Sequence, residues 1–557
     1  MKDLVQLVRF LRGTAAVGPL KTATLVLALL AGTAAGLAGI GLIVVIDEAI
    51  SATAAERLRL LGVFVALCLA QPILRLLSSW LLAHLSQTAR SDLEIQISRS
   101  ILAAPLHRIE RAGSSRLLSA LTEDVGNLIT ALTNLPVILR LAAVLAGGVL
   151  YLAVLSVPLF LRVVVAFALG VFSYRALVRL GSSSFTVSRG LTDRLFKSFQ
   201  ALTGGLKELK LHRLRREAFL EEELATTARA RAKAQIRAQG FFALAGGWGQ
   251  LLSFVAMGAV LFFSPADADT MTGFTLTILF LLSSLDNLLG LTPSLHRATV
   301  SLQHLRKLNL WLDEEVETVR KTASAEQPWS RIELAGATHA YSDETGRASF
   351  LLGPIDLTIE RGACVFLVGG NGSGKTTLGK LLTGLYLPNR GALRLDGTRI
   401  GETNSDRLRS LFSAVFTDFH LFPTLPGLKR EGWQEDAQGL LERLDLAHKV
   451  KLEAGGLSTV DLSQGQRKRL ALMTAYLEDR PIYLFDEWAA DQDPQFKEVF
   501  YRQLIPRLLE RGKTVVVITH DDRYFDLAQR IVKLDSGKVV FDGAPVTPVV
   551  PAVSAAV

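Results

Sequence analysis

Cysteine is nearly absent from this 557-residue chain, which has only Cys68 and Cys364. Cys68 lies in an apolar run and Cys364 in a predicted strand, so we expect neither a disulfide framework nor a cysteine metal site. Charged residues are also scarce, at 20% of the chain, whereas hydrophobic residues make up 49% and the mean hydropathy is +0.32. This composition is too apolar for an ordinary soluble enzyme and predicts a membrane protein with a soluble part.

Lysine and arginine outnumber the acidic residues, giving a net charge of +9. Such a charge is compatible with a nucleic-acid partner, but the basic residues cluster beside long apolar runs, as is typical of membrane proteins. We therefore expect membrane lipids, and no nucleic acid, as partners. The first apolar run is too long for a cleavable signal peptide, and further runs follow it. Before it, Met1–Lys21 predicts a short amphipathic helix on the inner membrane surface.

Six apolar runs follow one another, each near the ~20 residues that a membrane-spanning helix needs. In chain order they are Thr22–Ile46, Leu60–Leu85, Leu132–Ser156, Leu159–Val178, Phe241–Ser264 and Thr270–Leu291. The second and fourth connectors, Arg90–Gly126 and Arg179–Arg237, are long and basic, whereas the other three are short and hold few Lys or Arg residues. Because basic loops stay on the inner side of a membrane, both long connectors and both termini are predicted to be cytoplasmic.

The two long connectors are predicted to be helical extensions of the spans. Each pair of extensions bends around a short element, near Pro105–Ile109 in one connector and Gly205–Lys210 in the other. Two plain solvated helical hairpins explain the same pattern, so both interpretations stay open.

Three charged residues fall well inside predicted spans: Arg75 in the second, Arg140 in the third and Asp286 in the sixth, whereas Arg162 and Arg175 lie near the two ends of the fourth. Arg75 and Asp286 each share a helical face with neighbouring polar side chains. Because burying charge in a membrane is costly, such residues either snorkel or pair between helices, or they line a polar path for a transported molecule. The sequence leaves both interpretations open, and in the second these three residues line the substrate cavity.

The second half of the chain is organised around a glycine-rich stretch, Gly369–Thr376, which matches the pattern G-x-x-x-x-G-K-[ST] in full. An apolar strand is predicted before it and a helix after it, the context in which backbone N–H groups surround a phosphate. We expect Lys375 to reach the β- and γ-phosphates of ATP, and the Thr376 hydroxyl to ligate Mg²⁺. The predicted phosphate-binding residues are Gly370, Asn371, Gly372, Ser373, Gly374, Lys375, Thr376 and Thr377.

Two later predicted strands end in residues that suit phosphate chemistry. The run Ile482–Phe485 is followed by Asp486 and Glu487. Asp486 is placed to hold Mg²⁺ together with Thr376, and Glu487 to orient or deprotonate the attacking water. The strand after these ends in His520, which is placed to contact the γ-phosphate.

Ser463, Gly465 and Gln466 open a predicted helix between the glycine-rich stretch and these carboxylates. A helix N-terminus binds anionic phosphate, although an ordinary helix cap explains the serine equally well. Tyr341, upstream, either stacks on a base or is an ordinary surface or core tyrosine.

The order of a phosphate loop, the sequence LSQGQ at Leu462–Gln466, a strand ending in Asp-Glu and a strand ending in His resembles the ATP-binding cassette of ABC transporters, whose signature is LSGGQ. With six predicted spans before it, nearly the whole chain resembles an exporter-type half-transporter. This resemblance implies a homodimer in which Ser463 and Gly465 bind the γ-phosphate held by the partner chain, with Gln466 and Asp493 also at the ATP site. It also implies that the two basic connectors carry coupling helices.

Two stretches, Trp488–Pro494 and Gly204–Lys210, narrow the resemblance. Both resemble the bacterial exporters of cyclic peptides and siderophore precursors, among them the syringomycin, pyoverdine-precursor and microcin exporters. One position departs from the family pattern: Thr417 stands where most cassettes have a glutamine that senses Mg²⁺ and the membrane domain. Asp418 is the other candidate for that role.

We therefore predict an all-α membrane domain of six helices followed by an α/β P-loop ATP-binding cassette domain. The predicted parts are a transmembrane domain (1–312), a linker (313–331), a cassette (332–545) and a disordered tail (546–557). The predicted function is ATP-driven export of a peptide-like compound, namely a cyclic peptide, lipopeptide or siderophore precursor, across the bacterial inner membrane, with ATP and Mg²⁺ as cofactors. A lipid flippase and an ATP-gated channel or regulator are the alternatives, and the presence of both Glu487 and His520 argues against a degenerate gating site.

Overall fold

The computed structural model describes residues 19–263, 267–307, 328–342, 348–428, 432–453 and 456–545. The chain divides into two units, the first made of Met1–Ala104 and Arg108–Val316 and the second of Pro105–His107 and Glu317–Val557. Most of the predicted surface helix Met1–Lys21, most of the predicted linker 313–331 and the predicted tail 546–557 lie outside the described residues. The domain boundaries drawn from the sequence therefore stay a prediction.

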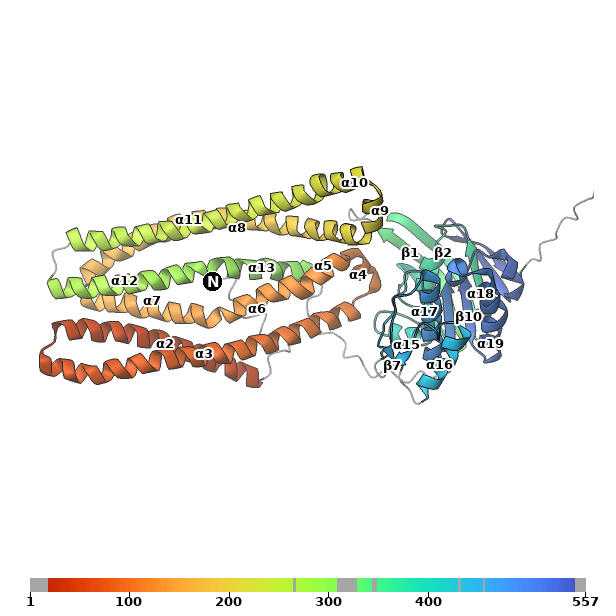
Figure 1. Ribbon diagram of the computed structural model, residues 1–557, viewed down its shortest axis with the longest axis horizontal. Helices are drawn as coiled ribbons and strands as arrows, with labels where there is room; N and C mark the ends of the chain where they lie inside the picture. The colour runs from red at the N-terminus through yellow and green to blue at the C-terminus, as the bar shows by residue number, and fades with distance from the viewer. Residues whose placement is uncertain are drawn as a thin grey trace, which may run out of the picture. The chain divides into compact units, whose positions relative to one another are not determined.

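Long helices make up the first unit (Figure 1). They are α2 (Pro19–Ser51), α3 (Ala54–Ala103), α7 (Leu135–Leu155), α8 (Val157–Gly204), α11 (Thr226–Phe263), α12 (Ala268–Gly290) and α13 (Thr292–Lys307). The six predicted spans fall on the first six of these helices, so the all-helical membrane domain is confirmed. Among the described residues, four stretches have the length and hydropathy of a membrane span: Thr22–Ser51, Ala54–Ala103, Ser114–Leu155 and Asp269–Arg306. The predicted spans on α8 and α11 are not among these four.

The two long connectors are helical, as predicted. Helix α3 continues beyond its apolar run and ends where Pro105 disfavours helical backbone at Ala104, whose ψ is 143°. The first connector then contains α4 (Leu106–Ala112), α5 (Ser114–Ser119), the π-helical turn η1 (Ala120–Asp124) and α6 (Val125–Thr133). The second contains α9 (Leu206–Leu211), α10 (Arg213–Ala218) and η2 (Phe219–Ala225). Helices α4 and α9 are the short elements around which the sequence predicts the connectors to bend.

Apolar side chains of α2, α7 and α12 form a core of the first unit, with Ile40, Val144 and Phe274 among them. Gly148 of α7 lies against Leu281 of α12 so closely that a Cβ at this position would collide with the leucine side chain. Large apolar side chains remain exposed elsewhere on these helices, as Trp80 of α3 illustrates. Such exposed apolar surface is what a membrane protein presents to lipid.

A buried carboxylate joins three helices of the first unit. Asp124 is fully buried, accepts a hydrogen bond of 2.8 Å from Arg189 of α8, and lies 2.6 Å from His304 Nδ1 of α13. Arg189 also pairs with Glu123 at 2.5 Å. Because an unpaired buried charge is strongly destabilising, these contacts hold α8 and α13 against η1.

Two sheets make up most of the second unit. The four-stranded sheet has the order β2-β1-β4-β5 and the six-stranded sheet the order β12-β11-β3-β10-β9-β6. The strands are β1 (Arg331–Ser342), β2 (Ala348–Glu360), β3 (Cys364–Gly369), β4 (Arg390–Leu395), β5 (Thr398–Arg399), β6 (Phe412–Val415), β7 (Leu452–Glu453), β8 (Gly456–Leu457), β9 (Ile482–Asp486), β10 (Thr514–Ile518), β11 (Arg530–Asp535) and β12 (Lys538–Gly543). In the six-stranded sheet only the β11–β12 pair is antiparallel among the described strands, so the predicted largely parallel α/β sheet is confirmed.

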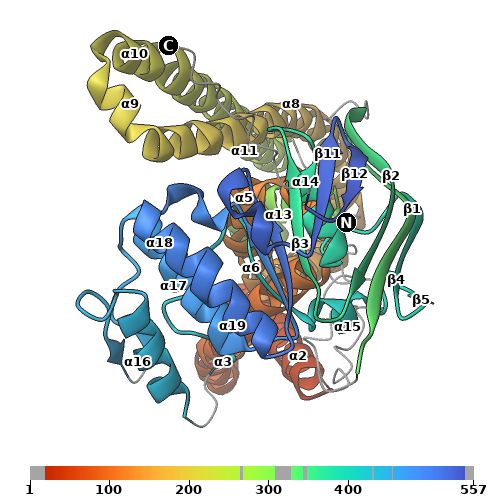
Figure 2. The same ribbon diagram turned by 90° about the vertical axis from the view of Figure 1, so that its right-hand side faces the viewer.

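Helices cover this sheet on both faces because its central strands are apolar on both faces. Phe366 of β3 packs in one core with α16, α17 and α19, whereas Val365 and Leu367 pack in the other with α14 and the four-stranded sheet. Figure 2 shows α17, α18 and α19 gathered on one side of β3, with β1, β2 and β4 on the other. The helices of this unit are α14 (Lys375–Leu382), α15 (Ser405–Arg409), α16 (Trp433–Arg443), α17 (Gln464–Glu478), η3 (Trp488–Asp491), α18 (Pro494–Val499), η4 (Phe500–Leu504), α19 (Ile505–Glu510) and η5 (Asp522–Leu527).

Candidate active site

The glycine-rich loop joins the end of β3 to the start of α14. Gly372 and Gly374 have φ values of 75° and 100°, a region that glycine adopts without steric cost. Lys375 is buried within this loop and donates hydrogen bonds to the carbonyl oxygens of Gly369 at 3.0 Å and Gly370 at 2.9 Å. Burial lowers the pKa of Lys375, and the neighbouring carboxylates of the site oppose this effect. The loop thus holds a cation ready for an anionic ligand.

Asp486 ends strand β9 and is fully buried. Neither of its carboxylate oxygens has a hydrogen-bond partner among the described residues. Burial raises the pKa of Asp486, while the neighbouring Thr376 hydroxyl and Lys375 charge lower it. A buried carboxylate without partners, beside a hydroxyl, is an oxygen-donor set that suits a hard divalent cation such as Mg²⁺.

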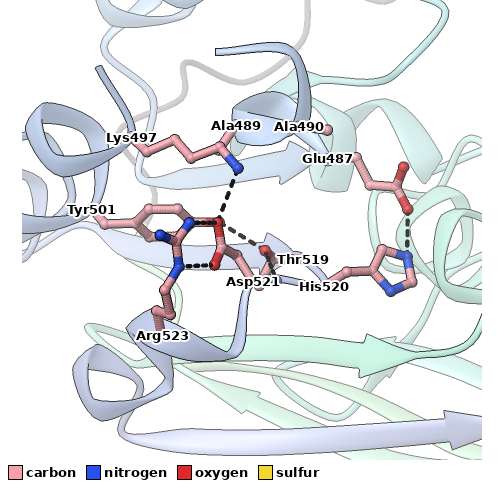
Figure 3. A pocket seen from close by; sticks show the side chains of 9 residues that line it. All are labelled: Glu487, Ala489, Ala490, Lys497, Tyr501, Thr519, His520, Asp521 and Arg523. Carbon is pink, nitrogen blue, oxygen red and sulfur yellow. Dashed lines mark hydrogen bonds and ion pairs between the residues drawn. The ribbon is translucent and has the colours of Figure 1, made fainter. Parts of the chain in front are cut away.

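Glu487 follows Asp486 and lies at the meeting point of three elements. Its amide donates to the carbonyl oxygen of Ile518 at 3.0 Å, which ties it to β10. A hydrogen bond of 2.9 Å joins its Oε1 to His520 Nε2, as Figure 3 shows, and Lys375 Nζ lies 4.0 Å from the same oxygen. The structure therefore brings together Lys375, Glu487 and His520, which the sequence placed in one site from three separate motifs.

A cavity of about 380 Å³ adjoins Glu487 and His520. Figure 3 shows the side chains that line it: Glu487, Ala489, Ala490, Lys497, Tyr501, Thr519, His520, Asp521 and Arg523. Hydrogen bonds from Arg523, and further ones from Lys497, lower the pKa of Asp521. The two basic side chains therefore favour the ionised form of this carboxylate, and Lys497 ties α18 to the segment after β10.

Ser463 caps the N-terminus of α17. Its hydroxyl accepts from the Gln466 amide at 3.4 Å, and the Gln466 side chain accepts from the Ser463 amide at 3.3 Å. The Asp493 carboxylate caps α18 by accepting from the Phe496 amide at 2.9 Å, and it pairs with Arg469 at 2.8 Å. No hydrogen bond or ion pair in the described part of the chain joins Ser463 or Gly465 to the phosphate loop. Within one chain, then, Ser463 acts as a helix cap and Gly465 lies in the first turn of α17, and their predicted role toward ATP stays a prediction that involves a second chain.

Tyr341 of β1 lies beside the first turn of α14. Its hydroxyl is 3.4 Å from Thr377 Oγ1 and donates to Tyr386 at 3.2 Å. Thr417 and Asp418 follow β6, the strand next to β9, and both are exposed. Val415 lies opposite Phe485 in the parallel β6–β9 pair, so Asp418 follows its strand at the same edge of the sheet as Asp486, whose pKa is raised most by burial and least by the Asp418 charge.

Comparison with known proteins agrees with this geometry. Residues 22–284 match the ABC transporter transmembrane region and residues 352–490 match the ABC transporter family. The chain is 39% identical over 530 residues to the ATP-binding protein SyrD of Pseudomonas syringae pv. syringae, a match covering 92% of this chain and 93% of SyrD. The chain belongs to the ABC transporter family.

Two further comparisons describe this ABC transporter. It is 26% identical over 506 residues to the ATP-dependent lipid A-core flippase of Burkholderia orbicola (strain AU 1054), covering 86% of this chain and 82% of the flippase. The structure of a bacterial Atm1-family ABC exporter with ATP bound matches it with a TM-score of 0.73 at 20% identity, over 95% of this chain and 96% of that chain. The last likeness shows a shared exporter fold. As an ABC exporter, the chain is an ATP-hydrolysing, multi-pass membrane transporter.

Arg75, Arg140 and Asp286 lie on three different helices of this ABC exporter, α3, α7 and α12. Arg75 is exposed on α3 and Arg140 is partly buried on α7. Asp286 is exposed on α12 and faces Gly246 of α11, at whose position a Cβ would lie 4.0 Å from the carboxylate. The predicted place of these three residues in one substrate cavity stays a prediction.

Several polar residues that sequence reasoning missed are held firmly in the structure. Lys468 is buried on α17 and Trp488 is buried on η3, and each contacts the other's element. Asp47 of α2 is buried as well and accepts a hydrogen bond of 2.5 Å from Tyr151. Its position directly after an apolar run was a usable signal, whereas a lysine among the charged residues of a helix gives none.

Proposed function

We propose that this ABC exporter moves a peptide-like compound out of the cytoplasm across the bacterial inner membrane. The observation that carries the ATP-driven part is the convergence of Lys375, Glu487 and His520 beside a buried, unpartnered Asp486. A site that merely gates in response to ATP has no need for a base held against a histidine. The arrangement favours hydrolysis coupled to transport over an ATP-gated channel or regulator.

Within the site, the chain's own residues divide the work. The amides of the glycine-rich loop and the Lys375 ammonium bind the phosphates, replacing the carbonyl contacts that Lys375 makes in the structure. Thr376 and Asp486 would hold Mg²⁺, which would neutralise charge on the phosphates when bound. Glu487 orients and deprotonates the attacking water, and His520 holds the Glu487 carboxylate while it contacts the γ-phosphate.

Thr417 and Asp418 are the two candidates for the role of the glutamine that most cassettes carry. We assign it to Asp418, because its charge acts on Asp486 and its carboxylate is an oxygen donor that Mg²⁺ accepts. Asp418→Ala is then expected to raise the Mg²⁺ concentration that half-maximal ATP hydrolysis needs. Thr417→Ala is expected to leave that concentration nearly unchanged. Equal effects of the two substitutions contradict this assignment.

Each complete site needs a second copy of the chain. The cap at Ser463 presents the N-terminus of α17, where amides and dipole favour an anion. In a homodimer, Ser463, Gly465, Gln466 and Asp493 of one chain complete the phosphate site of the other. Closure of the two cassettes around ATP drives the membrane helices from an inward-open to an outward-open state, and hydrolysis resets them.

The cargo assignment rests on two supports. The stretch Trp488–Pro494 resembles the exporters of cyclic peptides and siderophore precursors, and the chain is closer to SyrD at 39% identity than to the lipid A-core flippases at 26%. Arg75, Arg140 and Asp286 give the membrane helices both signs of charge amid apolar surface, which suits a molecule with a polar backbone and an apolar tail. The flippase matches make an anionic lipid the second candidate cargo.

ATPase stimulation in lipid nanodiscs separates the two cargoes. Amphipathic lipopeptides are expected to raise ATP turnover, and lipid A-type lipids to leave it at the basal rate. Arg75→Ala and Asp286→Ala are expected to reduce the stimulation more than the basal rate. The opposite pattern, with stimulation by lipid alone, favours the flippase. In cells, a deletion strain that secretes its peptides normally but has a disturbed distribution of lipid between the two leaflets also favours the flippase.

A further inference from the structure

Glu487 has an unusual backbone for a catalytic carboxylate. Its φ and ψ are 49° and 35°, in the left-handed region. For a residue with a side chain this conformation is strained and persists only when surrounding contacts impose it. Such contacts must come from outside the segment, because the 3.2 Å bond from the Ala490 amide to the Glu487 carbonyl oxygen is made within the same turn.

One outside contact comes from β10 and the other from α17. The Ile518 carbonyl oxygen accepts the Glu487 amide, and Lys468 Nζ donates to the Glu487 carbonyl oxygen at 2.9 Å. Lys468 also pairs with Asp491 at 2.7 Å, so its ammonium spans the turn that follows Glu487. Only 4% of the Lys468 side chain is exposed, so solvent competes little with these two bonds.

Trp488, the residue after Glu487, also bonds to Lys468. Its Nε1 donates to the Lys468 carbonyl oxygen at 2.7 Å, and its buried ring lies 4.4 Å from the Phe500 ring, centroid to centroid. Lys468 therefore holds the backbone of Glu487, while the next residue along holds the backbone of Lys468. These two hydrogen bonds together fix the backbone of Glu487 relative to α17.

Three more contacts extend the same attachment along the chain. Gln492 donates to the Gly465 carbonyl oxygen at 3.0 Å, and Arg469 donates to Gln492 at 2.9 Å and to Asp493 at 2.8 Å. The first turns of α17 and the segment after β9 consequently form one rigid block. Glu487 is carried by that block, and its side chain is aimed at His520 (Figure 3).

We propose that Lys468 is a positioning residue for ATP hydrolysis, which holds Glu487 in its left-handed backbone conformation so that the carboxylate stays in register with His520. Trp488 anchors Lys468 in turn. This inference rests on the role of Glu487 stated above. Lys468 acts through Glu487, since it makes no hydrogen bond or ion pair with the glycine-rich loop within the described residues.

Lys513 provides a matched control at the other end of the same helix. Its Nζ donates to the Asp479 carbonyl oxygen at 3.1 Å and pairs with Asp479 Oδ1 at 2.9 Å. Asp479 caps the C-terminus of α17 and also has a left-handed backbone, with a φ of 48°. Lys513 thus also bonds the carbonyl oxygen of an acidic residue with a left-handed backbone and pairs with a carboxylate, here both of Asp479, away from the catalytic residues.

The test uses the full-length protein in nanodiscs, with Lys468→Met, Lys468→Arg, Trp488→Phe and Lys513→Met. We expect Lys468→Met to lower kcat for ATP about 10- to 100-fold, the loss typical of a misplaced catalytic group, with the affinity for ATP unchanged within about twofold. Lys468→Arg should keep a higher kcat than Lys468→Met, because arginine can make part of the same contacts. If Lys468→Met does not fold, Trp488→Phe replaces it in the test and should also lower kcat. Lys513→Met should keep kcat while lowering the melting temperature as much as Lys468→Met does.

A double-substitution cycle tests whether Lys468 acts through Glu487. Adding Lys468→Met to Glu487→Gln should lower the residual hydrolysis rate no further, because the group being positioned is already inactive. The inference is overturned if Lys468→Met keeps the wild-type kcat while Glu487→Gln is inactive, if Lys513→Met loses as much kcat, or if the two substitutions are additive. Wild-type activity of Glu487→Gln itself would instead refute the proposed role of Glu487.

Discussion

Glu487 and His520 meet across the ends of two adjacent strands, with 2.9 Å between Oε1 and Nε2. Strands β9 and β10 pair in parallel, with Asp486 opposite Ile518, so the residues that follow each strand emerge at the same edge of the sheet. The register of these two strands is therefore enough to bring the histidine beside the carboxylate. This relationship makes Glu487 the residue on which the account of hydrolysis depends.

Glu487→Gln is expected to bind ATP and to hydrolyse it at least ~100-fold more slowly, because the amide keeps the shape of the side chain but cannot accept a proton. Steady-state ATPase and equilibrium ATP binding measure the two effects separately. Glu498→Gln is the control, since this carboxylate makes a surface pair with Arg502. Normal hydrolysis by Glu487→Gln is incompatible with a base at this position.

The pH dependence of stability reports on Asp521. Arg523 and Lys497 lower the pKa of this carboxyl in the folded state. A lowered pKa stabilises the fold above the unfolded-state pKa, and this contribution is lost as pH falls through the folded-state pKa. Asp521→Asn is therefore expected to melt below wild type at neutral pH and to approach it in acid. A difference in melting temperature that stays constant from neutral to acid pH would show that the charge of Asp521 has no part in it.

Mixed dimers test the shared site. Lys375→Ala removes the phosphate-binding cation from one chain, and Ser463→Arg blocks the α17 N-terminus of the other. Each variant alone should be inactive, whereas co-reconstitution should restore partial ATPase activity, because one site of the mixed dimer keeps both functional residues. If tagged pull-downs show mixed dimers and no activity returns, Ser463 does not act across the dimer.

Single cysteines test the membrane orientation, after replacement of Cys68 and Cys364. Cysteines at Val157 and Asp267, which lie at the starts of α8 and α12, should react with an impermeant thiol reagent in intact cells. A cysteine at Leu214, which is 81% exposed on α10, should react only after the membrane is opened. The reverse pattern would invert the predicted topology.

The sequence predicted the elements whose pattern lies in one continuous stretch of chain. Such stretches are the glycine-rich loop, the apolar strand before Asp486 and the six apolar runs, and the structure has the expected element at each. Lys468 could not be predicted, because its burial depends on Trp488, Glu487 and Asp491 from a segment about 20 residues later. The pairing of Asp124 with Arg189 and His304 depends in the same way on how separate helices pack.

Transport into inverted membrane vesicles tests the central claim most directly. Vesicles containing the wild-type protein should accumulate a labelled amphipathic lipopeptide above its outside concentration when ATP and Mg²⁺ are supplied, and vesicles containing Glu487→Gln should not. Lipopeptide that only equilibrates across the membrane, or that accumulates equally with Glu487→Gln, would contradict ATP-driven peptide export by this chain.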